Sequence, residues 1–141
     1  MKINNIQIHE ISEQLQCGFN IYINKETLEI IPIPDMETLI SDNEIWKEEL
    51  NKIESEWNDY AFITKMESRE AFKIMEAFID EIDDDKLKED LIKILNRKSP
   101  FANFKAEIDS SDYRQKWFDF RDLKYEDYVK EQLESEDFQI E

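Results

Sequence analysis

Histidine, cysteine and glycine, which supply much of the chemistry of protein sites, each occur only once in this chain of 141 residues. A single cysteine cannot form an internal disulfide bond, so the sequence predicts a reducing compartment, the cytoplasm. A single glycine leaves no glycine-rich loop to bind phosphate, and the sequence has no cluster of histidine and cysteine with the spacing of a zinc site. We therefore assign no catalytic, metal-binding or cofactor-binding residue and no cofactor, and we favour a protein that is not an enzyme.

Long apolar runs and positive charge are also scarce. No stretch approaches the roughly 18 consecutive apolar residues of a membrane span, and residues 1–7 lack the pattern of a secretory signal. The chain has 18 lysine and arginine residues against 35 aspartate and glutamate residues, a formal net charge of −17. Such a charge repels nucleic acids and anionic membranes. We expect a cytoplasmic protein that binds neither directly and whose partner is another protein.

Hydrophobic residues make up 40% of the chain, enough for a core, so the high charge does not indicate disorder. The length predicts one acidic globular domain over residues 1–141, with a frayed acidic tail at 134–141. The charge is uneven, because residues 97–130 hold eight basic and seven acidic residues. That segment is the one part of the chain without an acidic excess.

The hydrophobic periodicity predicts an α+β fold, mostly helical, with a small antiparallel sheet. A hairpin over 19–33 and a short strand over 60–64 should form the sheet. Gly18 is placed to end the first helix in the left-handed conformation. Helices are expected near residues 8–17, 43–57, 68–82, 87–95, 100–104 and 113–133. The core of a monomer should include Trp46, Leu50, Ile53, Phe72, Met75, Ile79, Leu91 and Trp117.

Two candidate sites fail on geometry. On one helix, eight residues would separate His9 from Cys17 by about 12 Å, too far for a nucleophile and its base. We expect His9 on the surface and Cys17 as a small buried side chain at the helix end. The acidic segment 80–85 lacks the carboxylate spacing and the glycine of an EF-hand calcium loop, so it is a solvated turn.

Basic and aromatic residues alternate in the segment without an acidic excess. Such a pattern can bind an acidic partner or phosphate groups. The alternative is that the aromatic side chains belong to the core and the cations pair with Asp109, Asp112, Asp119 and Asp122. On one helix, the side chains at 117 and 121 could form a cation–π pair. The candidate partner-binding residues are Lys105, Lys116, Arg121, Phe104 and Trp117.

Three functions remain open. The first is a non-enzymatic binding or regulatory module that uses this basic and aromatic surface. The second is an acidic decoy of nucleic acid, which would occupy a basic partner and lose it steeply as the salt concentration rises. The third is an enzyme that relies on carboxylates alone, with or without a divalent metal, whose melting temperature would then respond to magnesium or manganese.

The chain resembles the uncharacterised bacterial protein family 0158. The resemblance rests on Ile74-Met75-Glu76-Ala77-Phe78-Ile79, Phe101-Ala102-Asn103-Phe104-Lys105 and Lys116-Trp117-Phe118-Asp119-Phe120-Arg121, together with a strand–turn–strand opening at residues 22–30. It covers about residues 11–133 and implies a bacterial, cytosolic α+β protein without an established activity. Members of that family tend to have glycine where this chain has Leu28, and a glycine-rich approach where it has Arg97-Lys98-Ser99-Pro100.

Overall fold

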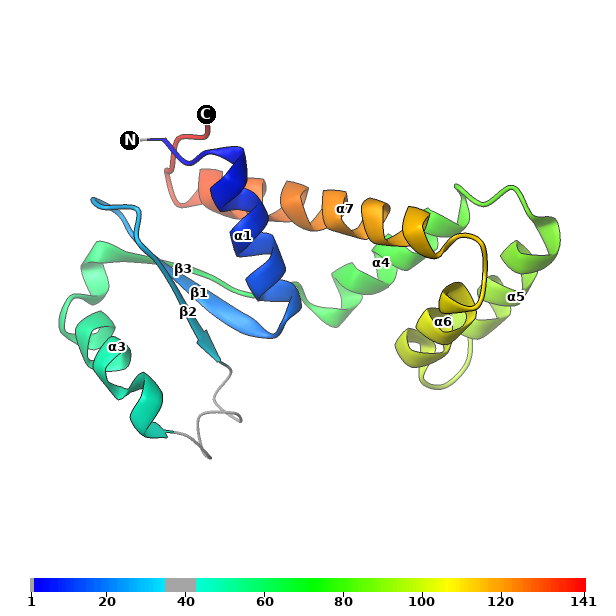
Figure 1. Cartoon of the computed structure of the whole chain (residues 1–141), viewed down its shortest axis with the longest axis horizontal. Helices are drawn as coiled ribbons and strands as arrows, with labels where there is room; N and C mark the ends of the chain where they lie inside the picture. Colours follow the sequence, from blue (N-terminus) through cyan, green and yellow to red (C-terminus); the bar gives the residue numbers. More distant parts are fainter. Residues whose placement is uncertain (1, 35–42) are drawn as a thin grey trace. The chain divides into compact units, whose positions relative to one another are not determined.

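The chain divides into two compact units. The computed structural model describes residues 2–34 and 43–141, without the side chains of residues 43–46 (Figure 1). Unit 1 consists of Met1–Lys65 and Tyr125–Glu141, and unit 2 of Met66–Lys124. Among the described residues, the buried side chains form two clusters in unit 1 and one in unit 2. The sequence pattern marks which residues are apolar and leaves open how many clusters they form.

Unit 1 is built on a three-stranded antiparallel sheet with strand order β2-β1-β3. Strands β1 (Phe19–Asn24) and β2 (Ile30–Pro34) form the predicted hairpin, and β3 (Tyr60–Ile63) pairs with the other edge of β1. The predicted α+β fold with a small antiparallel sheet is confirmed. Proline occurs twice in β2, which a sheet tolerates because an edge strand needs ladder donors on one side only.

The side chains of β1 alternate between the two faces of the sheet, and both faces are covered by other elements of unit 1. Ile21 and Ile23 point to one face, where they pack with side chains of helix α1 (Asn5–Gln16) and of the last turns of α7. Tyr22 points to the opposite face, which packs against helix α3 (Asn43–Ser55) through the buried Ile53. The 3₁₀ turn η1 (Trp57–Asp59) leads from α3 into β3.

Unit 2 contains helices only. These are α4 (Ser68–Ile79), α5 (Asp85–Leu95), α6 (Pro100–Asp109) and the first part of α7 (Arg114–Ser135), which continues into unit 1. Their apolar faces meet in one cluster, in which the Trp117 ring lies 5.0 Å from the Phe104 ring and 5.2 Å from the Phe78 ring. None of the helices in the described ranges is long and apolar enough to cross a membrane.

Most of the predicted core residues are buried, although in two units. Leu50 and Phe72 are half-buried at the margins of their clusters. The side chain of Trp46 lies outside the described residues. The buried members are Ile53, Met75, Ile79, Leu91 and Trp117.

The C-terminal tail is attached to unit 1, contrary to the predicted fraying over residues 134–141. Ile3 and Ile140 form a parallel bridge. The Ile3 amide donates to the Gln139 carbonyl at 2.9 Å, and the Glu141 amide donates to the Ile3 carbonyl at 2.9 Å. Phe138 and Ile140 pack on the cluster that α1 and β1 share. The acidic residues suggested fraying, but the two apolar residues between them hold the tail in place.

Candidate functional site

The structure separates the five candidate binding residues. Phe104 is 1% exposed and Trp117 is 7% exposed, and both rings pack in the core of unit 2. Both residues are therefore buried in the core, whereas the sequence predicted them to be on a binding surface. Lys105 and Lys116 are exposed, and Arg121 is half-buried.

The cations in the first part of α7 lie beside aromatic rings. The Arg114 and Arg121 guanidinium groups each lie 5.0 Å from the centre of the Phe118 ring, and the Lys116 amine lies 5.3 Å from that of Tyr113. Arg121 therefore contacts the ring at i−3, and not the inward-facing Trp117 at i−4. The alternative hypothesis was that the cations pair with nearby aspartates. Two such ion pairs are present, Arg114 with Asp109 and Arg121 with Asp122, each at 3.4 Å.

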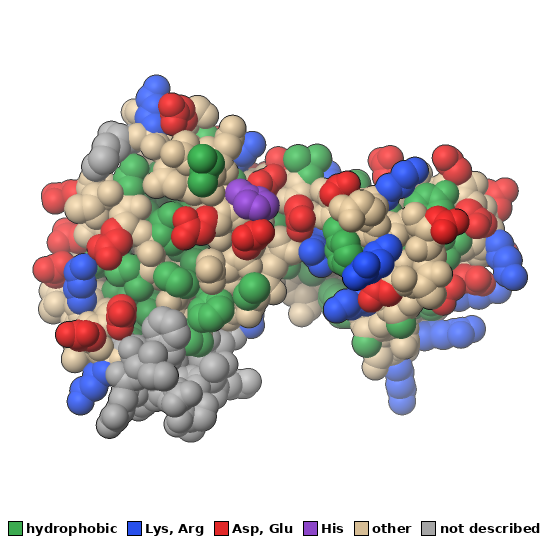
Figure 2. Space-filling view, in the orientation of Figure 1, with side chains coloured by type: hydrophobic (Ala, Val, Ile, Leu, Met, Phe, Trp, Pro, Cys, Tyr) green, Lys and Arg blue, Asp and Glu red, His purple; other side chains and the backbone are tan. Residues whose placement is uncertain are grey.

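Residues 91–106 contain four basic residues and no acidic one, in a chain with 35 carboxylates. The structure folds this stretch into the end of α5, a short loop and most of α6. Lys93, Arg97, Lys98 and Lys105 are all exposed, and none of the four forms an ion pair within the described residues. Figure 2 shows blue side chains projecting from the end of unit 2 where the α5–α6 loop lies.

Two exposed apolar side chains accompany these cations. Ile92 is 45% exposed and Phe101 is 41% exposed, and the Phe101 ring stands edge-on to Phe72 at 6.5 Å. We call the set of Ile92, Lys93, Arg97, Lys98, Phe101 and Lys105 the basic α5–α6 surface. Neither Ile92 nor Phe101 is among the five candidates named from the sequence, although Phe101 belongs to the alternating basic and aromatic segment.

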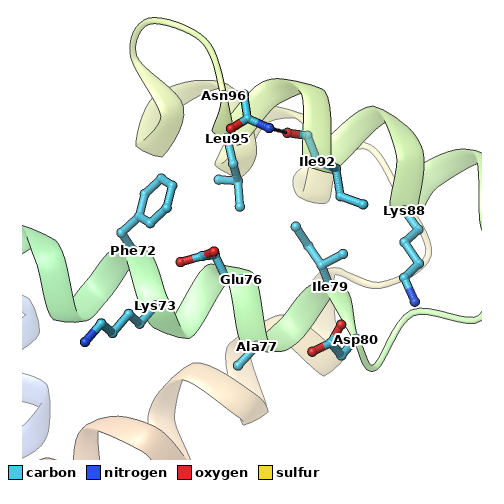
Figure 3. Close-up of a pocket in the computed structure, with 10 residues that line it drawn as sticks. All are labelled: Phe72, Lys73, Glu76, Ala77, Ile79, Asp80, Lys88, Ile92, Leu95 and Asn96. Carbon is cyan, nitrogen blue, oxygen red and sulfur yellow. Dashed lines mark hydrogen bonds between the residues drawn. The ribbon is translucent and has the colours of Figure 1, made fainter.

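A groove of about 420 Å³ lies between α4 and α5 and adjoins this surface (Figure 3). Ile79 and Leu95 line it, and Phe72 and Ile92 point into it from the two helices.

The groove also contains charged groups. The Glu76 carboxylate points into it, and Asp80 and Lys88 lie toward one end. Because Ile92 belongs to both features, the groove and the basic α5–α6 surface are continuous. Together they can take up an apolar side chain and anionic groups.

The residues that the structure describes include no group of three or more His, Cys, Asp and Glu side chains that could hold a metal ion. Cys17 is exposed at the end of α1, so the expectation that it is buried was wrong. Cys17 lies two positions after the buried Leu15, about 200° around the helix, so it is off the buried face of α1. Gly18 follows with φ 94°, which confirms its role in ending the helix.

His9 is on the surface, as expected, and lies between two carboxylates of unit 1. Its Nδ1 is 3.2 Å from Glu126 on α7, and its Nε2 is 3.1 Å from Glu13 on α1. The hydrogen bond with Glu126, followed by the charge of Glu13, raises the pKa of His9 above its usual 6.5. The protonated imidazole therefore links α1 to α7.

This link predicts a pH-dependent effect on stability. A raised pKa in the folded state means that the contribution is fully present below the unfolded pKa and is lost as the pH rises through the folded pKa. We expect His9→Gln to lower the melting temperature slightly at about pH 6 and to have no effect at about pH 9. Glu126→Gln should reproduce this difference. Equal melting temperatures of the wild type and His9→Gln at the lower pH would contradict the prediction.

A model of the uncharacterised protein family UPF0158 matches residues 8–141, which is most of the chain. The chain belongs to this family. No curated protein and no solved structure matches the chain. Two residues near turns of this chain have an unusual backbone, since Leu28 has φ 62° and Ser99 has φ 53°. Both lie in the left-handed region that favours glycine. Ser99 immediately precedes α6 and lies within the loop of the basic α5–α6 surface.

Proposed function

We propose that this UPF0158 protein is a non-enzymatic binding module of the cytoplasm. In this proposal, the basic α5–α6 surface and the adjoining groove bind an acidic segment of another protein. The observation that carries the proposal is the set of four exposed cations without ion-pair partners in the described structure, around the exposed Ile92 and Phe101. The single exposed Cys17 fits a reducing compartment, where a thiol stays free.

The local charge explains how an acidic protein could attract an acidic partner. Unit 1 has 20 acidic and six basic residues, whereas unit 2 has 15 acidic and 12 basic residues. The net charge is therefore −14 for unit 1 and −3 for unit 2. Within unit 2, the cations of residues 93–105 have no carboxylate between them in sequence. An acidic segment meets the least repulsion here, and its carboxylates can pair with lysine and arginine.

The apolar side chains supply the binding energy that charge pairs at a surface do not. Exposed ion pairs contribute little, at most about 1 kcal/mol each. Burial of an aromatic or aliphatic side chain contributes about 1.5–3 kcal/mol. Phe101 can be covered by the partner, and the groove lined by Ile79 and Leu95 can receive one apolar side chain from it. We therefore expect a partner segment that combines aspartate or glutamate with apolar residues.

The previously predicted residues take different roles in this proposal. Lys105 belongs to the binding surface. Lys116 and Arg121 are engaged with aromatic rings of their own helix and contribute less. Phe104 and Trp117 support the surface from within the core.

The test uses a fluorescent peptide of alternating aspartate and leucine and measures its binding by anisotropy. We expect the double variant Lys98→Glu/Lys105→Glu to weaken binding by about tenfold. The matched control is Lys2→Glu/Lys25→Glu, which makes the same change in net charge at exposed positions of unit 1. The control should bind nearly as well as the wild type.

Equal losses in the two double variants would contradict the proposal, because binding would then depend on net charge alone. A peptide with lysine in place of aspartate distinguishes the decoy function. If that peptide binds and the variant Lys98→Glu/Lys105→Glu does not weaken its binding, the acidic surface is the active one and the proposed module is wrong.

A further inference from the structure

A second groove lies in unit 1, between β2 with its preceding turn and α3, and has a volume of about 480 Å³. It contains three carboxylates and one amine. One wall is apolar and belongs to the edge strand of the sheet. The lining residues are Glu29, Ile30, Ile31, Pro32, Glu48, Glu49 and Lys52.

The one amine in this groove is already engaged. The Lys52 Nζ lies 3.2 Å from Glu29 Oε2. The hydrogen bond and charge of Glu29, with a smaller contribution from Tyr60, raise the pKa of Lys52. Lys52 therefore balances Glu29, and the charges of Glu48 and Glu49 remain without a cation in the groove.

One buried oxygen atom in this groove, Glu49 Oε2, has no hydrogen-bond partner. Native structures satisfy nearly all buried polar groups, and a carboxylate oxygen removed from water without a donor is costly. Glu49 Oε2 therefore lacks a positively charged donor, because the one amine of the groove is engaged by Glu29.

The geometry points to an arginine side chain as this donor, and we propose that the β2–α3 groove binds an arginine of a basic protein segment. A metal ion is disfavoured because the carboxylates here do not converge into a cluster that could hold one within the described structure. A guanidinium group instead spreads five N–H donors over a plane, and it can reach acceptors that lie apart. The apolar wall of Ile30, Ile31 and Pro32 can cover the aliphatic part of the arginine.

The charge of unit 1 favours the same partner. Its net charge of −14 attracts a basic segment over a distance of about a Debye length, and the groove then determines where the segment docks. This inference does not depend on the proposed function, because it concerns the other unit and a partner of opposite charge.

The test measures binding of a short fluorescent peptide with two arginines, compared with the same peptide in which citrulline replaces arginine. Citrulline keeps the shape of arginine and has no charge. We expect the arginine peptide alone to bind, and Glu49→Gln to weaken its binding about tenfold. Glu26→Gln, an exposed residue of the hairpin turn outside the groove, makes the same change in net charge and should weaken binding less than twofold.

The melting temperature shows whether Glu49→Gln weakens binding without destabilising the fold. Because Glu49→Gln removes an unpaired buried carboxylate oxygen, we expect it to leave the melting temperature unchanged or to raise it. Equal weakening by Glu26→Gln and Glu49→Gln would overturn the proposal, and so would the absence of binding up to about 1 mM peptide at low salt. A rise in melting temperature with calcium or magnesium that Glu49→Gln abolishes would also overturn it, in favour of a metal site.

Discussion

Replacing Phe104 with alanine should lower the free energy of unfolding by about 3–5 kcal/mol. The Phe104 side chain is 1% exposed, and its ring meets the Trp117 ring at 5.0 Å with an angle of 69° between the two planes. Alanine would lose this contact and leave a cavity at the centre of the cluster that α4, α5, α6 and α7 share. Urea denaturation followed by tryptophan fluorescence measures the change.

Phe101 is the matched control, because it lies on the same helix and is 41% exposed. Phe101→Ala removes the same atoms from a position largely in contact with water, and it should cost about 1 kcal/mol or less. A loss as large as that of Phe104→Ala would show that both rings belong to the core and would remove Phe101 from the binding surface. The two variants together therefore test the fold and the site.

The double variant Phe138→Ala/Ile140→Ala should lower the free energy of unfolding by about 2–4 kcal/mol. Both side chains are half-buried and pack on the cluster that contains Ile3, Ile8 and Ile11. The two backbone hydrogen bonds between residue 3 and the tail hold the side chains in register. Chemical denaturation of the full-length variant measures the loss, and the charge of the tail stays the same.

A frayed tail would give a different result. If the double variant cost less than about 0.5 kcal/mol, the tail would contribute nothing to unit 1, and the expectation from the sequence would be right after all. Glu136→Gln is the control for the polar part of the tail. Its side chain is exposed, and we expect no measurable loss of stability.

The sequence alone determined the local elements of this protein. Alternation in Phe19, Ile21 and Ile23 predicted the central strand, because successive side chains of a strand point to opposite faces. The single glycine predicted the end of the first helix, because its backbone conformation is unfavourable for other residues. The net charge of −17 also follows from the sequence alone, since long-range charge depends on composition more than on folding.

Only the tertiary structure decided which aromatic residues face inward. Helix α7 has aromatic residues on more than one face, so its periodicity does not define a buried side. Trp117 becomes buried because α4 and α6 present Phe78 and Phe104 to it, whereas Phe118 is half-buried at the margin of the cluster and lies beside two arginines. Helix α6 likewise has Phe101 and Phe104 one turn apart, and only Phe104 is buried, whereas Phe101 stands edge-on to Phe72 of α4 and stays 41% exposed.

The position of the C-terminal tail also depends on contacts between residues far apart in the sequence. Its composition is acidic, and nothing in its local sequence indicates that Ile140 pairs with Ile3 at the other end of the chain. Local patterns fix the conformation of a segment and the relative directions of its side chains. Which segment then covers them depends on contacts between residues far apart in sequence, and those contacts placed Phe104, Trp117 and the tail in the cores while leaving the basic α5–α6 surface exposed.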